Sequence, residues 1–102
     1  MADTTVARRY ARALLELGLE QGNLDKISSE LQRFTDLLHA NDDQVLGALN
    51  HPGLVPEERK AFLNVVLERY PFEATVANFV KLAQDKGRVN AIPAINTELQ
   101  TM

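Results

Sequence analysis

TTVARRYARALLEL, residues 4–17, decides the fold, because the helix it predicts is apolar on two sides. An ordinary surface helix carries a single apolar stripe with the spacing i, i+3, i+4, i+7. Here the first stripe consists of Val6, Tyr10, Ala13 and Leu17. The second stripe consists of Ala7, Ala11, Leu15 and Gly18. A helix of this kind in a small protein either lies at the centre of the core or keeps one side for a partner.

The rest of the sequence predicts five more helices and no strand. After a first helix over residues 4–20, apolar residues recur at helical spacing in segments 24–38, 45–49, 56–70, 73–86 and 90–99. The segments are separated by Gly22, the possible cap Asn41-Asp42-Asp43, Pro52, Pro71 and Gly87. Connections this short bring successive helices into antiparallel contact. We therefore expect an all-α, compact bundle of six helices in a single domain spanning residues 1–102.

Composition narrows the classes of function. The chain has 102 residues, of which 45 % are hydrophobic and 25 % charged, as in ordinary soluble domains. A formal net charge of −3 disfavours nucleic acid as a partner, because phosphate binding requires a basic face. There is no cysteine, hence no disulfide and no thiolate metal site. No apolar run approaches the roughly 20 residues of a membrane span.

The sequence offers little for catalysis. Its two histidines are His39 and His51, and no phosphate-loop or nucleophile-elbow pattern occurs. His51 precedes a proline in a predicted turn, where a polar residue needs no catalytic explanation. His39 with Asp42 and Asp43 could gather a metal, but a helix-capping cluster explains these residues better. We therefore predict no catalytic, cofactor-binding or metal-binding residue and no cofactor.

Two apolar surfaces remain as candidates for binding. If Ala7, Ala11 and Gly18 face the core, then Tyr10, Ala13 and Leu17 stay partly outside. Segment 73–86 has a similar surplus, with Asn78 and Leu82 beside its core positions. Either all of these residues close one core, or the two segments form a groove for a partner's amphipathic helix. The basic group Arg8, Arg9 and Arg12 is then either a solvated face or a charged rim of that groove.

Several segments resemble the delta subunit of bacterial F-type ATP synthase, the counterpart of the mitochondrial oligomycin-sensitivity-conferring protein. They are VARRYARAL (6–14), LNHP (49–52), EERK (57–60), NF (78–79) and KGRVNAIP (86–93). They occur in the family's order and cover nearly the whole chain. The first and last of these segments, taken together, are specific for this family.

The resemblance implies a fold and a partner. The family's N-terminal domain is a six-helix bundle on top of the catalytic head, where a groove between its first and fifth helices binds the N-terminal helix of an alpha subunit. This match assigns partner binding to Tyr10, Ala13, Leu14, Leu17, Asn78, Leu82 and Lys86. The family's second domain, which this sequence lacks, joins the peripheral stalk, so contact with the stalk is implied only through that missing domain.

The implied function is mechanical. A non-catalytic stator subunit would resist rotation of the head and so couple proton flow to ATP synthesis. The resemblance places it peripherally on the cytoplasmic face of the bacterial inner membrane. It implies no binding of nucleic acid and no insertion into the membrane. One alternative is an unrelated helical adaptor that captures an amphipathic peptide. Another is an enzyme or ligand-binding bundle, which would need a buried polar pocket with perturbed ionisable groups.

Overall fold

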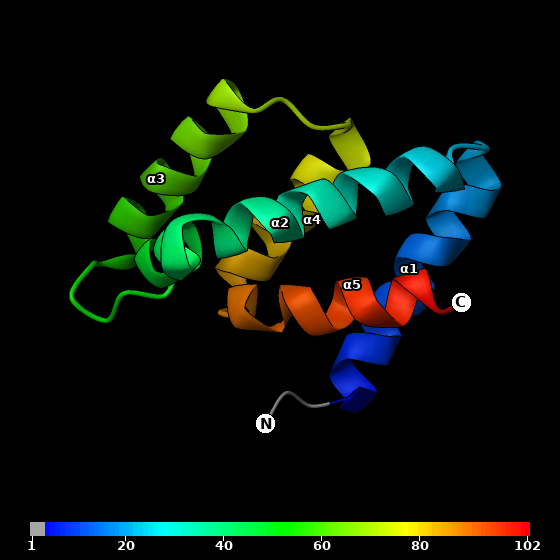
Figure 1. Ribbon diagram of the computed structural model, residues 1–102, viewed down its shortest axis with the longest axis horizontal. Helices are drawn as coiled ribbons and strands as arrows, with labels where there is room; N and C mark the ends of the chain where they lie inside the picture. The colour runs from blue at the N-terminus through cyan, green and yellow to red at the C-terminus, as the bar shows by residue number, and fades with distance from the viewer. Residues whose placement is uncertain (1–3) are drawn as a thin grey trace.

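The computed structural model describes residues 4–102, and these residues are all-α without a strand (Figure 1). The helices are α1 (Thr4–Gln21), α2 (Leu24–Leu49), α3 (Pro56–Arg69), α4 (Ala74–Asp85) and α5 (Ile92–Gln100), with a 3₁₀ turn η1 (Val89–Ala91) before α5. The predicted fold class is confirmed. The predicted groove-forming segments 4–20 and 73–86 correspond to α1 and α4.

Five helices are counted instead of the predicted six, because the expected second and third helices join at a kink within α2. The sequence places the interruption correctly, since residues 40–43 leave the helical conformation. Asn41, Asp42 and Asp43 adopt left-handed φ angles of 53°, 57° and 62°. Asn and Asp tolerate this region better than other side chains that carry a Cβ. The chain therefore makes a left-handed kink here, which separates two helical stretches within α2.

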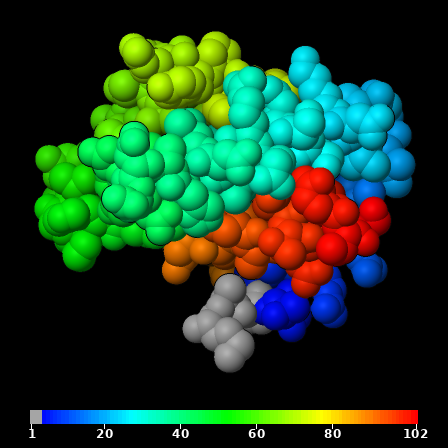
Figure 2. Space-filling view, in the orientation of Figure 1, coloured from blue at the N-terminus to red at the C-terminus, as the bar shows by residue number. Residues whose placement is uncertain are grey.

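The long α2 organises the packing. It crosses the molecule in Figure 1, with α1 and α5 packed on one another and on α2, while α3 and α4 pack on α2 and on each other. The largest fully buried side chains are Phe34, Ile27, Leu31, Leu38 and Leu49 of α2, Leu63 of α3, Val76 and Val80 of α4, Val89 of η1, and Ile92 and Ile95 of α5. Figure 2 shows the first turns of α1 projecting beyond α5 at the lower edge.

Helix α1 turns its small residues to the core. Ala7, Ala11 and Gly18 are buried, whereas Tyr10 is half-buried and Leu17 is 40 % exposed. This confirms that the small stripe faces inward. The sequence analysis placed Leu15 in that stripe, but Leu15 is only half-buried, and Leu14 is the large α1 residue in the core. Small side chains let α5 and α2 approach α1 closely, and this close approach fixes the orientation of the outer stripe.

Gly18 marks the closest approach between α1 and α2. A Cβ atom at Gly18 would lie 2.8 Å from Cα of Leu24. The Gly18 carbonyl also accepts a hydrogen bond from the backbone N–H of Asn23 at 3.0 Å. Only a residue without a side chain lets the chain reverse this tightly between the two helices.

Candidate functional site

An open groove of about 430 Å³ lies between α1 and α4. Its α1 wall consists of Tyr10, Ala13, Leu14, Leu17 and Gln21. Its α4 wall consists of Thr75, Asn78, Phe79 and Leu82. None of these lining residues carries a charge. Three other cavities, between α3 and the end of α4, between α3 and the start of α4, and at the α1–α2 turn, each include charged side chains in their linings.

The groove exists because its two walls rest on different neighbours. α1 packs on α5 and α2, and α4 packs on α2 and α3. The walls meet through the rings of Tyr10 and Phe79, whose centroids are 5.9 Å apart with an interplanar angle of 64°. They meet again where the Thr75 hydroxyl donates to Oε1 of Gln21 at 3.2 Å. Because Tyr10 faces Phe79 and Gln21 faces Thr75, the two walls run antiparallel.

The groove combines a floor that belongs to the core with exposed apolar side chains on both walls. Leu14 and Phe79 are buried and form the floor. Leu17 on the α1 wall and Leu82 on the α4 wall are 40 % and 45 % exposed. Large side chains held half out of the core on neighbouring helices make a contiguous apolar surface, and such surfaces mark interaction sites. The arrangement can bind an apolar face.

The structure brings six of the seven predicted groove residues together: Tyr10, Ala13, Leu14, Leu17, Asn78 and Leu82. Lys86 does not line the groove, because α4 ends at Asp85. The Lys86 N–H closes that end by donating to the Leu82 carbonyl at 3.0 Å, and its side chain is exposed. Lys86 is therefore not among the lining residues, and its contact with a partner stays a prediction.

Three lining residues are absent from the predicted set: Gln21, Thr75 and Phe79. Helical spacing could have found the first two, since Gln21 follows Leu17 by four positions and Thr75 precedes Asn78 by three. Phe79 lies in the core, and its ring also forms part of the groove floor. A side chain at the boundary between core and groove packs in the core and also lines the groove.

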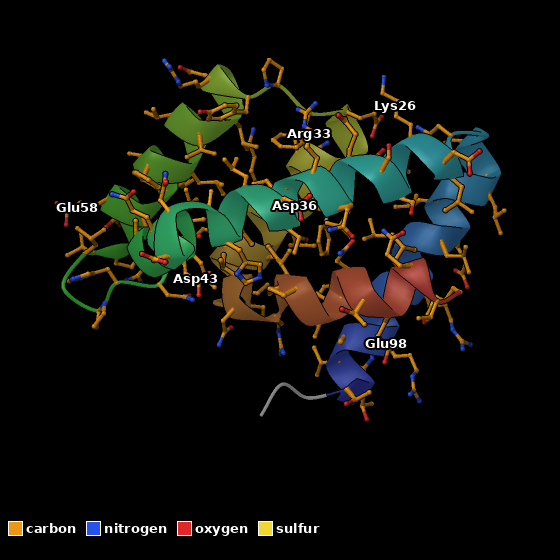
Figure 3. All side chains as sticks on the ribbon, in the orientation of Figure 1. Lys26, Arg33, Asp36, Asp43, Glu58 and Glu98 are labelled. Carbon is orange, nitrogen blue, oxygen red and sulfur yellow. The ribbon has the colours of Figure 1, made fainter. Side chains whose placement is uncertain are left out.

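The basic group on α1 does not form the groove lining. Arg8 makes an ion pair at 3.5 Å with Glu98 of α5, the helix that packs on α1. Figure 3 labels Glu98 on α5, where this helix crosses α1. Arg9 and Arg12 are exposed. Exposed pairs of the Arg8–Glu98 kind contribute little to stability.

The remaining sequence candidates have structural roles. His39 Nδ1 lies 2.6 Å from Oδ1 of Asp43 across the left-handed turn of α2. Nδ1 of His51 accepts from the Gly53 N–H at 2.9 Å within the loop before α3. Across residues 4–102, no three His, Cys, Asp or Glu side chains converge as a metal site would require. None of the helices in this range has the length and apolar character needed to cross a membrane.

Comparison with known proteins gives a consistent result. The family model for the ATP synthase delta (OSCP) subunit matches residues 6–102. The chain is 36 % identical over 95 residues to ATP synthase subunit delta of Geobacter metallireducens, covering 93 % of the chain and 52 % of the relative. It is 36 % identical over 102 residues to that of Desulfatibacillum aliphaticivorans, covering 100 % and 55 %.

A third relative, ATP synthase subunit delta of Myxococcus xanthus, is 33 % identical over 97 residues, covering 93 % of the chain and 53 % of the relative. The chain thus spans about half the length of each of these relatives. Both the family model and the relatives cover nearly all of the sequence. The chain belongs to the ATP synthase delta (OSCP) subunit family.

Proposed function

We propose that this chain is a non-catalytic stator component of an F-type ATP synthase, and that the α1–α4 groove binds the N-terminal helix of an alpha subunit on top of the catalytic head. Family membership supports the first part. The proposal that the groove binds this helix is supported by the uncharged lining and by the exposed Leu17 and Leu82 on opposite walls. An amphipathic helix laid along such walls is an established mode of peptide recognition.

The dimensions of the groove suit a short helix. From Tyr10 to Gln21 the α1 wall rises roughly 16 Å, at about 1.5 Å per residue, which equals about three helical turns. A partner helix of that length would bury its apolar stripe against Leu14 and Phe79. A standard interface covers about 800 Å² on each partner, and affinity then depends on the quality of the anchors rather than on area.

The mechanical role follows from the shape of such a contact. A rotary enzyme turns a central shaft inside a head that must not turn with it, so the stator has to transmit an opposing torque. A helix lying in a groove resists this load because its contacts along three turns must shear together. We propose that the chain acts in this way as the N-terminal domain of a two-domain subunit, peripherally on the cytoplasmic face of the membrane, and that the second domain makes the contact with the peripheral stalk.

The test is a calorimetric titration of the chain with a peptide comprising the N-terminal segment of the alpha subunit from the same organism. We expect a single site with one peptide per chain and a negative heat-capacity change, because apolar surface is buried. A scrambled peptide of the same composition is the control, since it has no apolar stripe. Absence of binding by the alpha-subunit peptide would contradict the proposal. Equal binding by both peptides would indicate nonspecific adhesion and would contradict it too.

A further inference from the structure

The rim of the α1–α4 groove carries opposite charges at its two ends. On α1, Arg9 precedes Ala13 by four positions, whereas Glu16 follows Ala13 by three and Glu20 follows Leu17 by three. Residues three or four apart are neighbours on a helix surface. Arg9, Glu16 and Glu20 are all exposed and therefore form a stripe just outside the lining. The α1 rim is basic at the Tyr10 end and acidic at the Gln21 end.

The α4 wall repeats this order in space because it runs antiparallel to α1. Its N-cap is Glu73, whose carboxylate accepts from the Thr75 N–H at 2.8 Å, so this charge lies at the Gln21 end. Its C-cap is Lys86, beyond Leu82 and toward the Tyr10 end. Lys81 and Asp85 lie on the last turns with opposite charges that offset one another. Both walls are therefore basic at one end and acidic at the other.

Four of the rim charges are available to a partner, whereas the carboxylate of the half-buried Glu73 already accepts from the Thr75 N–H. Within residues 4–102, no salt bridge involves Arg9, Glu16, Glu20 or Lys86. From Arg9 to Glu20 the helix rises roughly 16 Å. This exceeds the Debye length of about 8 Å at physiological ionic strength, so each end acts on its own part of a bound segment.

We infer that the groove selects the direction of the helix it binds: acidic residues of the bound helix lie at the Tyr10–Leu82 end and basic residues at the Gln21–Thr75 end. This inference rests on the proposed function of the groove. A helix is itself stabilised by acidic residues in its first turn and basic residues in its last. A partner helix of that common type lies parallel to α1 and antiparallel to α4. Its chain then continues past the α1–α2 turn.

The experiment uses a designed peptide and the ¹⁵N-labelled chain. The peptide is an amphipathic helix of about four turns with two Glu in its first turn, two Lys in its last turn and a nitroxide label at its N-terminus. We expect paramagnetic broadening of the amides around Tyr10 and Leu82, and with the label moved to the C-terminus, of those around Gln21 and Thr75. A peptide with Gln in place of all four charges is the control and should bind in both directions.

Two ion pairs between rim charges and peptide charges should give about a tenfold excess of one binding direction over the other at low salt, because each exposed ion pair changes an affinity by up to a few-fold. The excess should shrink in about 0.5 M salt, where the charges are screened. The double variant Arg9→Glu with Glu20→Lys should abolish the preference for one direction, because it inverts the charges on α1 while Glu73 and Lys86 of α4 keep theirs. With the label at the N-terminus of the peptide, equal broadening at both ends, or stronger broadening at the Gln21 end, would overturn the inferred direction while leaving the groove as the binding site. No broadening along the groove with either label would contradict both the direction and the proposed function.

Discussion

Replacing Ala13 with aspartate is expected to weaken binding of the alpha-subunit peptide at least about a hundredfold, which corresponds to roughly 2.8 kcal/mol. Ala13 is exposed on the α1 wall, between Tyr10 and Leu17. A carboxylate there would face the apolar stripe of the docked helix, and burial of an unpaired charge costs several kcal/mol. The fold should remain intact, because no core contact is lost. The affinities are measured by calorimetric titration, and thermal unfolding shows whether the variant is folded.

Ala61→Asp is the matched control. Ala61 is also exposed on a helix, but it lies on α3 and does not line the groove. The same chemical change there should leave the affinity unaltered. Arg12→Ala, which removes a charge outside the lining, should change affinity by less than about tenfold and act mainly through its salt dependence. Binding at full strength by a folded Ala13→Asp chain would exclude the α1–α4 groove.

Two glycine substitutions are expected to shift stability in opposite directions. Gly18→Ala should destabilise the fold by about 1–2 kcal/mol, although alanine is the better helix former by about 1 kcal/mol. The new methyl group would meet the backbone of Leu24 at 2.8 Å, and backbone cannot move aside as a flexible side chain can. Gly47→Ala should stabilise α2 by about 0.5–1 kcal/mol, because a Cβ at Gly47 meets nothing within 4 Å.

Thermal unfolding of the two variants checks this pair. For a domain of this size, each 1 kcal/mol shifts the midpoint by about 4–8 °C, so a fall for Gly18→Ala and a rise for Gly47→Ala are both measurable. Denaturant titration should give the same order with unchanged m-values. If Gly18→Ala raised the midpoint as Gly47→Ala does, the close packing of α1 on the start of α2 would be wrong.

The sequence predicted the fold class and most of the candidate site for a physical reason. Ala7, Ala11 and Gly18 are too small to fill a core alone, so their stripe had to face a closely packed neighbour. That choice left Tyr10 and Leu17 at the surface. Helical periodicity then connected these two with Asn78 and Leu82, although only the three-dimensional packing of α1 and α4 on different neighbours makes a groove between them.

Other features depend on conformations that periodicity cannot report. Asn41-Asp42-Asp43 correctly predicts an interruption, but periodicity does not show that the two helical stretches join there at a left-handed kink, so five helices are counted instead of six. Lys86 has the spacing of a groove residue, but it is the C-cap of α4 and does not line the groove. Leu14 and Leu15 are adjacent, and the rotation of α1 that buries Leu14 is set by contact with α5 and α2.

The location of the alpha-subunit peptide on the chain tests the proposed site most directly. Chemical-shift mapping of the ¹⁵N-labelled chain during titration with this peptide measures that location. We expect the largest changes at Tyr10, Leu17 and Leu82, saturating at one peptide per chain. Changes concentrated instead on the cavity between α3 and α4, at Leu67 and Lys81, with the α1–α4 groove unperturbed, would contradict it.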